Sequence, residues 1–160
     1  MTPNTALGPQ PRLQMRLQMQ GTAVAIEGRG VLLRGPSGAG KSSLALRLIE
    51  DGAILIADDL CELRRSCGWL TIDLPAAVDP AFLGAIERRG QGIVKVAYAG
   101  AAPLALIVDL APMKAPPDTI QLLGVAIPRA VLDPFQADSV ATLRKMALAS
   151  DRLGPLQLKA

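Results

Sequence analysis

The sequence predicts an α/β domain, because short apolar segments typical of strands alternate with segments of helical spacing. Half of the 160 residues are hydrophobic, yet aromatic residues make up only 2%. A core of Ala, Leu, Ile and Val is expected for a sheet buried under helices. A chain of this length forms one domain, which we expect over residues 13–150. Residues 1–12 are expected to form a disordered leader and residues 151–160 a loose tail.

Composition and charge exclude several classes of protein. The net charge is +3, and no cluster of Lys and Arg is interleaved with aromatic residues, so no nucleic-acid surface is predicted. Cys61 and Cys67 do not have metal-ligand spacing, and the chain contains no histidine, so two reduced structural thiols are expected. The longest uncharged apolar stretch, residues 97–108, is broken by Gly100 and Pro103 and is too short to cross a membrane. The start lacks a signal-peptide pattern, and we expect a cytoplasmic protein.

The apolar periodicity predicts the elements in order. A hairpin of strands 22–26 and 31–34 leads into a helix from Lys41 that ends near Asp51, with Gly52 as its C-cap. An apolar strand at 53–57 follows, then a second hairpin of 60–65 and 69–74. Residues 75–85 are expected to form a loop with one helical turn, and residues 86–93 a charged loop before a strand that ends at Val96. Further strands at 104–110 and, as a short edge strand, 125–128 precede an amphipathic helix at 139–149.

The segment between the first hairpin and the first helix matches the phosphate-binding pattern G-x-x-x-x-G-K-[ST]. It consists of Gly35, Pro36, Ser37, Gly38, Ala39, Gly40, Lys41 and Ser42. The glycines let backbone N–H groups turn toward a phosphate, the lysine adds a positive charge, and the serine hydroxyl suits Mg²⁺. A glycine-rich turn before an ordinary helix is the alternative. The apolar strand before the pattern and the helix after it favour a nucleoside phosphate site.

Two adjacent carboxylates complete a possible catalytic centre. Asp58 and Asp59 follow the apolar strand 53–57, and such strand ends converge on the ligand crevice of a doubly wound sheet. Adjacent strand residues point to opposite sides, so one acid could hold Mg²⁺ while the other accepts a proton. The alternative is a simple turn with an acidic cap. From the residues alone, Glu87 and its neighbours Arg88 and Arg89 indicate only a solvated loop.

Several ordered motifs resemble the catalytic domain of bacterial HPr kinase/phosphorylase. They are the hairpin before the phosphate pattern, Ile-Leu-Ile-Ala-Asp-Asp at 54–59, Ile-Glu-Arg-Arg-Gly-Gln-Gly-Ile at 86–93, and Leu-Gly-Val-Ala-Ile-Pro at 123–128. The resemblance covers residues 20–148 and implies a mixed sheet with flanking helices, similar to phosphoenolpyruvate carboxykinase. It further implies an ATP- and Mg²⁺-dependent kinase that phosphorylates a serine of the phosphocarrier HPr and assembles as a homohexamer. With only a short leader before the catalytic domain, the sequence resembles the truncated alphaproteobacterial forms, which lack the N-terminal domain.

The resemblance also implies a role for each matching residue. The residues from Gly35 to Ser42 would bind the nucleotide, with Lys41 on its phosphates. Ser42 and Glu87 would hold Mg²⁺, and Asp58 would support the metal or the proton. Asp59 would deprotonate the substrate serine. Arg89 would orient the phosphate or the HPr loop.

This chain departs from the family at several cationic positions. Gln20 replaces the family's active-site histidine, the family's later arginine has no matching residue although Lys114 is nearby, and the loop 133–139 lacks the family's arginines. The reverse, phosphorylase reaction brings an additional phosphate to the site, so we expect it to be weak or absent here. Two alternatives remain open: a nucleotide-binding regulatory module with degenerate catalysis, and a kinase that acts on a substrate other than HPr.

Overall fold

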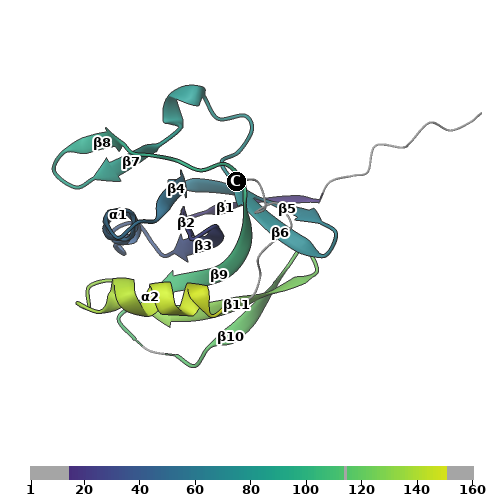
Figure 1. Ribbon diagram of the computed structural model, residues 1–160. Helices are drawn as coiled ribbons and strands as arrows, with labels where there is room; N and C mark the ends of the chain where they lie inside the picture. The colour runs from purple at the N-terminus through teal and green to yellow at the C-terminus, as the bar shows by residue number, and fades with distance from the viewer. Residues whose placement is uncertain (1–14, 114, 151–160) are drawn as a thin grey trace, which may run out of the picture.

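The structure, a computed structural model, describes residues 15–113 and 115–150 (Figure 1). The helices are α1 (Lys41–Glu50), α2 (Ser139–Leu148) and the short 3₁₀ helix η1 (Pro80–Phe82). The first strands are β1 (Arg16–Gln20), β2 (Thr22–Ile26), β3 (Arg29–Arg34), β4 (Ile54–Ala57), β5 (Leu60–Ser66) and β6 (Trp69–Asp73). The later ones are β7 (Ala85–Arg88), β8 (Gly92–Lys95), β9 (Ala102–Leu110), β10 (Asp118–Leu122) and β11 (Val125–Leu132).

One mixed sheet contains nine of these strands. Its main path runs β1-β5-β6-β9-β3-β2-β4, while β11 pairs with β9 and β10 pairs with β11. Strand β9 is long enough to join two regions: its first residues pair with β6, and the rest pairs with β3 and β11. Strands β7 and β8 form a separate hairpin beside β4 and α1 (Figure 1).

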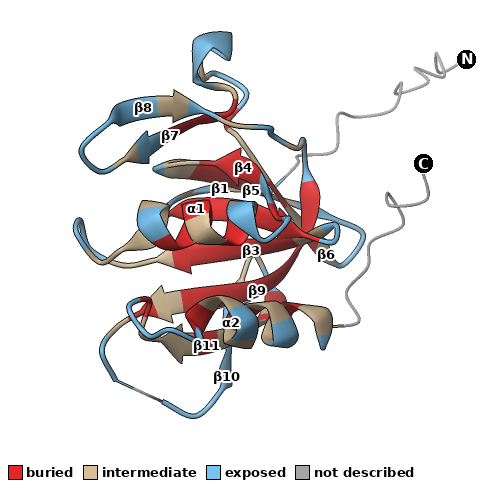
Figure 2. Ribbon diagram, turned by 60° about the vertical axis from the view of Figure 1, so that its left-hand side comes forward, coloured by how far each residue is buried: buried red, intermediate tan, exposed pale blue. Residues whose placement is uncertain are grey.

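Four strands of the sheet end at the same edge. Strands β3 and β11 both run parallel to β9. Strand β2 is antiparallel to both β3 and β4, so β4 also points in this direction. Figure 2 shows the arrowheads of β3, β9 and β11 together on its left-hand side. The segments that follow these strands therefore meet at one edge of the sheet.

The core lies on both faces of this sheet. Along β3, Val31 and Leu33 pack with α1 and α2, whereas Leu32 packs with the residues of β5 and β6. This alternation follows from the two-residue period of a strand. Both long helices cover one face, and the curled sheet covers the other with its own strands β5 and β6. The predicted α/β class is confirmed, but the sheet is not doubly wound.

Several predicted elements are confirmed and others are corrected. The two hairpins, the helix that begins at Lys41 and the final helix lie where they were expected. The predicted loop over 86–93 is wrong, because Ile86 is fully buried within β7 and β8 begins at Gly92. The predicted edge strand at 125–128 is also wrong, because β11 runs on to Leu132 between β9 and β10. Pro128 is tolerated there because it faces Thr119 of β10, and the pairing with β9 starts only at Arg129.

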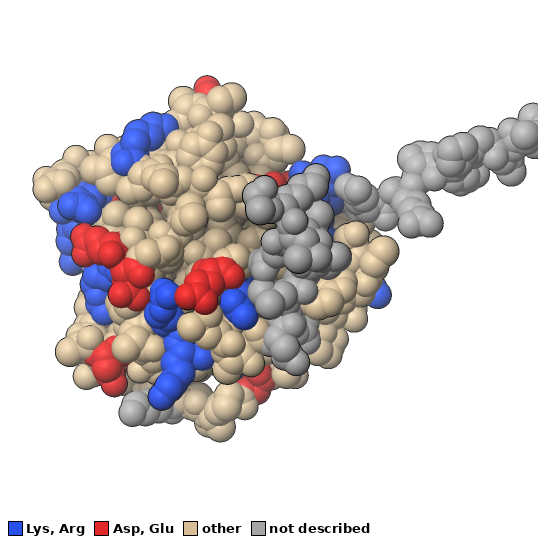
Figure 3. Space-filling model, viewed as in Figure 1, with Lys and Arg blue, Asp and Glu red and all other residues tan. Residues whose placement is uncertain are grey.

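Charged side chains of both signs lie on the surface. On the face shown in Figure 3, basic and acidic side chains are interspersed. Within residues 15–113 and 115–150, no helix is long and apolar enough to cross a membrane. The predicted leader and tail lie outside the described residues. The two cysteines are unpaired, with Cys61 buried and Cys67 exposed on the turn after β5, so only Cys61 belongs to the core.

Candidate active site

The segment Gly35–Ser42, here called the glycine-rich loop, connects β3 to α1 at this edge. Gly38 and Gly40 adopt positive φ angles of 83° and 98°, which L side chains rarely adopt. A Cβ atom on Gly35 would lie only 2.8 Å from Cβ of Ala39. The backbone N–H of Ala39 donates to the carbonyl of Pro36 over 3.0 Å and closes the turn. The glycines therefore permit this tight loop, which side chains at the same positions would strain or push apart.

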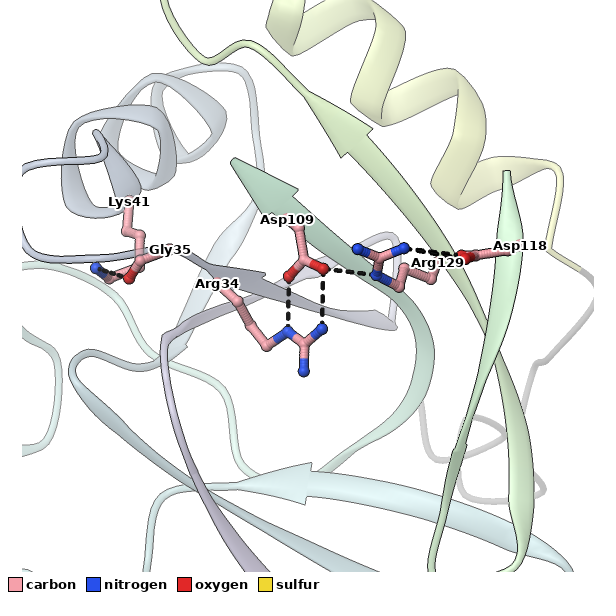
Figure 4. A network of polar contacts seen from close by, with 6 residues as sticks. All are labelled: Arg34, Gly35, Lys41, Asp109, Asp118 and Arg129. Carbon is pink, nitrogen blue, oxygen red and sulfur yellow. Dashed lines mark hydrogen bonds and ion pairs between the residues drawn. The ribbon is translucent and has the colours of Figure 1, made fainter. Parts of the chain in front are cut away.

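Helix α1 presents its positive end at this loop. Its N-cap residue is Gly40, which offers no side-chain hydrogen bond to the first turn. The Lys41 ammonium donates to the carbonyls of Gly35 at 2.7 Å and Pro36 at 2.9 Å, so it lies over the loop (Figure 4). A lysine charge and a helix N-terminus together attract an anion.

The carboxylate of Asp58 joins three distant segments of the chain beside the glycine-rich loop. Its Oδ1 accepts hydrogen bonds from Thr22 Oγ1 at 2.8 Å and Ser42 Oγ at 3.1 Å. Its Oδ2 accepts the backbone N–H of Glu87 at 3.2 Å. The start of β2, the start of α1 and strand β7 are thereby connected. Asp58 brings Ser42 and Glu87, two of the predicted metal ligands, into one neighbourhood.

Asp59 occupies a different environment from Asp58. The two acids lie in a turn after β4 and not on the strand itself. The expected strand alternation, with the two side chains on opposite sides, therefore does not apply to them. Asp59 instead adopts a left-handed φ of 76° and is exposed, while its carbonyl accepts the N–H of Gly21 at 3.0 Å. Burial, followed by the charges of Asp58 and Asp59, raises the pKa of the neighbouring Cys61 thiol to about 12. That thiol stays protonated and is no nucleophile at neutral pH.

The remaining predicted residues lie around this centre. Glu87 is exposed on β7, and Arg89 is exposed in the turn between β7 and β8. Gln20 ends β1, where it is exposed and pairs with Leu60, directly after the two acids. Lys114 lies outside the described residues. The structure therefore gathers Lys41, Ser42, Asp58, Asp59 and Glu87 at one edge of the sheet, with Gln20 beside them.

The donor set in this neighbourhood fits Mg²⁺ better than a transition metal. In the described part of the chain, no group of three or more His, Cys, Asp or Glu side chains could hold a metal by themselves. The available ligands are the Ser42 hydroxyl and the carboxylates of Asp58 and Glu87, all hard oxygen donors. Mg²⁺ binds one or two carboxylates and keeps water and phosphate as its other ligands.

A partly buried ion-pair network holds the end of β3, from which the glycine-rich loop departs. Arg34, the last residue of β3, donates to both oxygens of Asp109 on β9 at 2.7 and 2.9 Å (Figure 4). Arg129 of β11 donates to the same carboxylate at 2.6 Å and to Asp118 at 3.0 Å. This network was not predicted from the sequence. The signal was a single carboxylate in the otherwise apolar stretch 104–110.

Comparisons with known proteins show the family to which the chain belongs. The family model described as HPr Serine kinase C-terminal domain matches residues 11–104. An HPr kinase/phosphorylase of Clostridium botulinum is 39% identical over 85 residues, which are 53% of this chain and 27% of that protein. One of Listeria monocytogenes is 40% identical over 87 residues, with 54% and 27% covered. The chain therefore aligns with about a quarter of the length of these relatives.

A solved structure supports the fold. The structure of the HPr(Ser) kinase/phosphatase from Coxiella burnetii is similar with a TM-score of 0.71 and 23% identity, over 83% of this chain and 95% of that one. The fold is a mixed α/β domain with a glycine-rich loop between a strand and a helix. The family match, which spans more than half of the sequence, shows that the chain belongs to the HPr serine kinase C-terminal domain family.

Asp109 should stabilise the fold in a pH-dependent way. Burial alone would raise its pKa, but hydrogen bonds from Arg34 and Arg129 and their charges lower it below the ordinary value of 3.8. A folded-state pKa below the unfolded one contributes stability above about pH 4, which is lost as the pH falls through the folded value. Asp109→Asn should therefore cost about 1–2 kcal/mol of unfolding free energy at pH 7 and progressively less toward pH 3.

Urea unfolding of both proteins at pH 7, 5 and 3 measures this difference. Asp118→Asn is the matched control, because that carboxylate is 54% exposed and pairs with Arg129. It should cost less than about 0.5 kcal/mol. An Asp109→Asn variant as stable as the wild type at pH 7, or equally destabilised at pH 3, would refute the assignment.

Proposed function

We propose that this protein is an ATP- and Mg²⁺-dependent protein serine kinase that phosphorylates HPr or an HPr-like phosphocarrier protein. The observation that carries the proposal is the Asp58 carboxylate, which connects Ser42 of the glycine-rich loop with Glu87. Membership of the HPr kinase family supports the substrate class. The hairpin β2–β3 that leads directly into the loop supports a fold of the phosphoenolpyruvate-carboxykinase type.

Each residue has a role in this reaction. The glycine-rich loop and Lys41 bind the phosphates of ATP. Ser42, Glu87 and Asp58 would hold Mg²⁺, which neutralises phosphate charge when bound. The exposed Asp59 carboxylate accepts the proton of the substrate serine, whose oxygen bonds to the γ-phosphorus while the bond to the β-phosphate oxygen breaks. Arg89, at the exposed turn after β7, orients the phosphate or the partner's loop.

The resemblance to the family also suggests a location and an assembly for the protein. We propose a cytoplasmic homo-oligomer, a hexamer by resemblance, that contacts neither nucleic acid nor membrane. Light scattering tests the assembly, since a mass near 16.7 kDa in solution would mean a monomer.

Phosphate transfer from labelled ATP to HPr of the same organism tests the kinase proposal. Lys41→Ala should lower transfer by at least about a hundredfold, because phosphate contacts of this kind are worth a few kcal/mol in the transition state. Its unfolding midpoint should stay near that of the wild type, since the ammonium contacts only loop carbonyls. Lys145→Ala, an exposed lysine on α2, is the control and should be fully active.

Three other results of that assay would contradict all or part of the proposal. ATP binding without transfer to any protein of a cell lysate indicates a regulatory module. Transfer to a protein other than HPr identifies a different substrate. Full activity of Lys41→Ala refutes the role of the loop.

The two adjacent acids should respond differently to the same substitution. Asp59→Asn should retain ATP binding and lose transfer, because an amide cannot accept the serine proton. Asparagine also tolerates the left-handed backbone at this position, so strain is avoided. Asp58→Asn should instead weaken the binding of ATP in the presence of Mg²⁺. Parallel binding and transfer assays measure both effects, and a fully active Asp59→Asn beside an inactive Asp58→Asn would reverse the roles.

The reverse reaction should be weak or absent. It brings inorganic phosphate to phosphoserine, and the chain contains no histidine to share that charge. Of the described arginines, Arg47 reaches the loop after β11, but its guanidinium binds the carbonyls of Pro134 and Gln136. Serine-phosphorylated HPr with Mg²⁺ and millimolar phosphate should release little pyrophosphate, and Gln20→His should raise this rate selectively. Release as fast as forward transfer in the wild type would overturn the prediction.

A further inference from the structure

Phe135 is an exposed aromatic side chain at the rim of the glycine-rich loop. It lies between β11 and α2 and is 71% exposed, in a chain with only two phenylalanines. A Cβ atom built on Gly40 would lie 3.2 Å from Cζ of Phe135, so the tip of the ring rests against the N-cap of α1. The rest of the ring is open to solvent. An exposed phenylalanine that touches a binding loop offers a free aromatic face to a ligand.

The backbone around Phe135 is held firmly in place. Asp133 accepts the N–H of Phe135 at 2.9 Å, and Ser139 Oγ donates to the carbonyl of Asp133 at 2.7 Å. Arg47 of α1 donates to the carbonyl of Pro134 at 2.6 Å, and Pro134 itself is buried. The helix that begins at the glycine-rich loop is thus tied to the segment that carries the ring. The position of Phe135 relative to that loop is set by these contacts.

The order of the strands gives the direction in which a nucleotide would lie. Asp58 follows β4, and Glu87 lies in β7, whose backbone binds Asp58. Both residues are on the β4 side of β3. Phe135 follows β11, on the other side of β3 beyond β9. Figure 2 shows the β7–β8 hairpin beyond one side of α1 and α2 beyond the other. If the terminal phosphate points toward Asp58, the nucleoside end points toward Phe135.

We propose that Phe135 binds the base of the nucleotide by stacking against its ring. The inference rests on the proposed function, since it requires a nucleoside triphosphate in the glycine-rich loop. Aromatic stacking accepts every base, because each has a π-face, so Phe135 contributes affinity for the nucleoside without selecting adenine. Arg47 acts as a positioning residue that keeps the Phe135 segment beside the loop.

Binding of ATP and of inorganic tripolyphosphate, both with Mg²⁺, tests the proposal on the full chain. Tripolyphosphate offers the phosphates without a base. Phe135→Ala should weaken ATP binding roughly tenfold and change tripolyphosphate binding less than about twofold. Phe135→Trp should restore ATP affinity. Phe82→Ala is the matched control: the other phenylalanine is 59% exposed on η1 and should not affect either ligand.

The outcomes separate this inference from the proposed function. Equal ATP affinity of Phe135→Ala and the wild type overturns the stacking role, and the kinase proposal then stands. Equal losses for ATP and tripolyphosphate show that Phe135 shapes the loop, which also overturns it. A raised KM for the protein substrate with unchanged ATP affinity assigns the ring to the partner instead. A wild type that binds neither ligand contradicts the proposed function and the inference with it.

Discussion

The carboxylate of Asp58 is the contact on which the arrangement of the site depends. It accepts hydrogen bonds from the first residue of β2, the first turn of α1 and the backbone of β7. These segments are far apart in the sequence, and the β7–β8 hairpin does not belong to the main sheet. Asp58 can hold them together because β3 and β4 end at the same edge. The sheet topology thus supplies the position, and one carboxylate connects the parts.

A second carboxylate has a structural role of the same kind. Asp109 binds the arginine that immediately precedes the glycine-rich loop and a second arginine on β11. Strands β3, β9 and β11 are therefore tied together at their carboxyl ends, beside the segment that carries Phe135. The same ion-pair network therefore supports both the phosphate side and the nucleoside side of the proposed site.

Much of the site was predictable because its signals are local. A glycine pattern between an apolar strand and a helix defines the loop, and the pair Asp58–Asp59 marks the end of the next strand. The elements that were missed depend on distant partners. Strand β1 alternates between exposed and half-buried residues and pairs with β5, far along the chain. At the end of β7 and in the turn after it, the charged Glu87-Arg88-Arg89 sequence resembles a solvated loop, because the burial of Ile86 against α1 is a tertiary effect. No local sequence pattern around Thr22 or Asp109 indicates which distant residues they bind.

The central claim is that the glycine-rich loop, Asp58 and Glu87 form one site for a nucleotide and Mg²⁺. Calorimetric titration of the protein with ATP, with and without Mg²⁺, tests it most directly. The account predicts one ATP per chain and an affinity that falls at least about tenfold when Mg²⁺ is removed, because Ser42, Asp58 and Glu87 would hold the metal and its charge would offset that of the phosphates. ATP binding that is independent of Mg²⁺, or no binding at all, would contradict it.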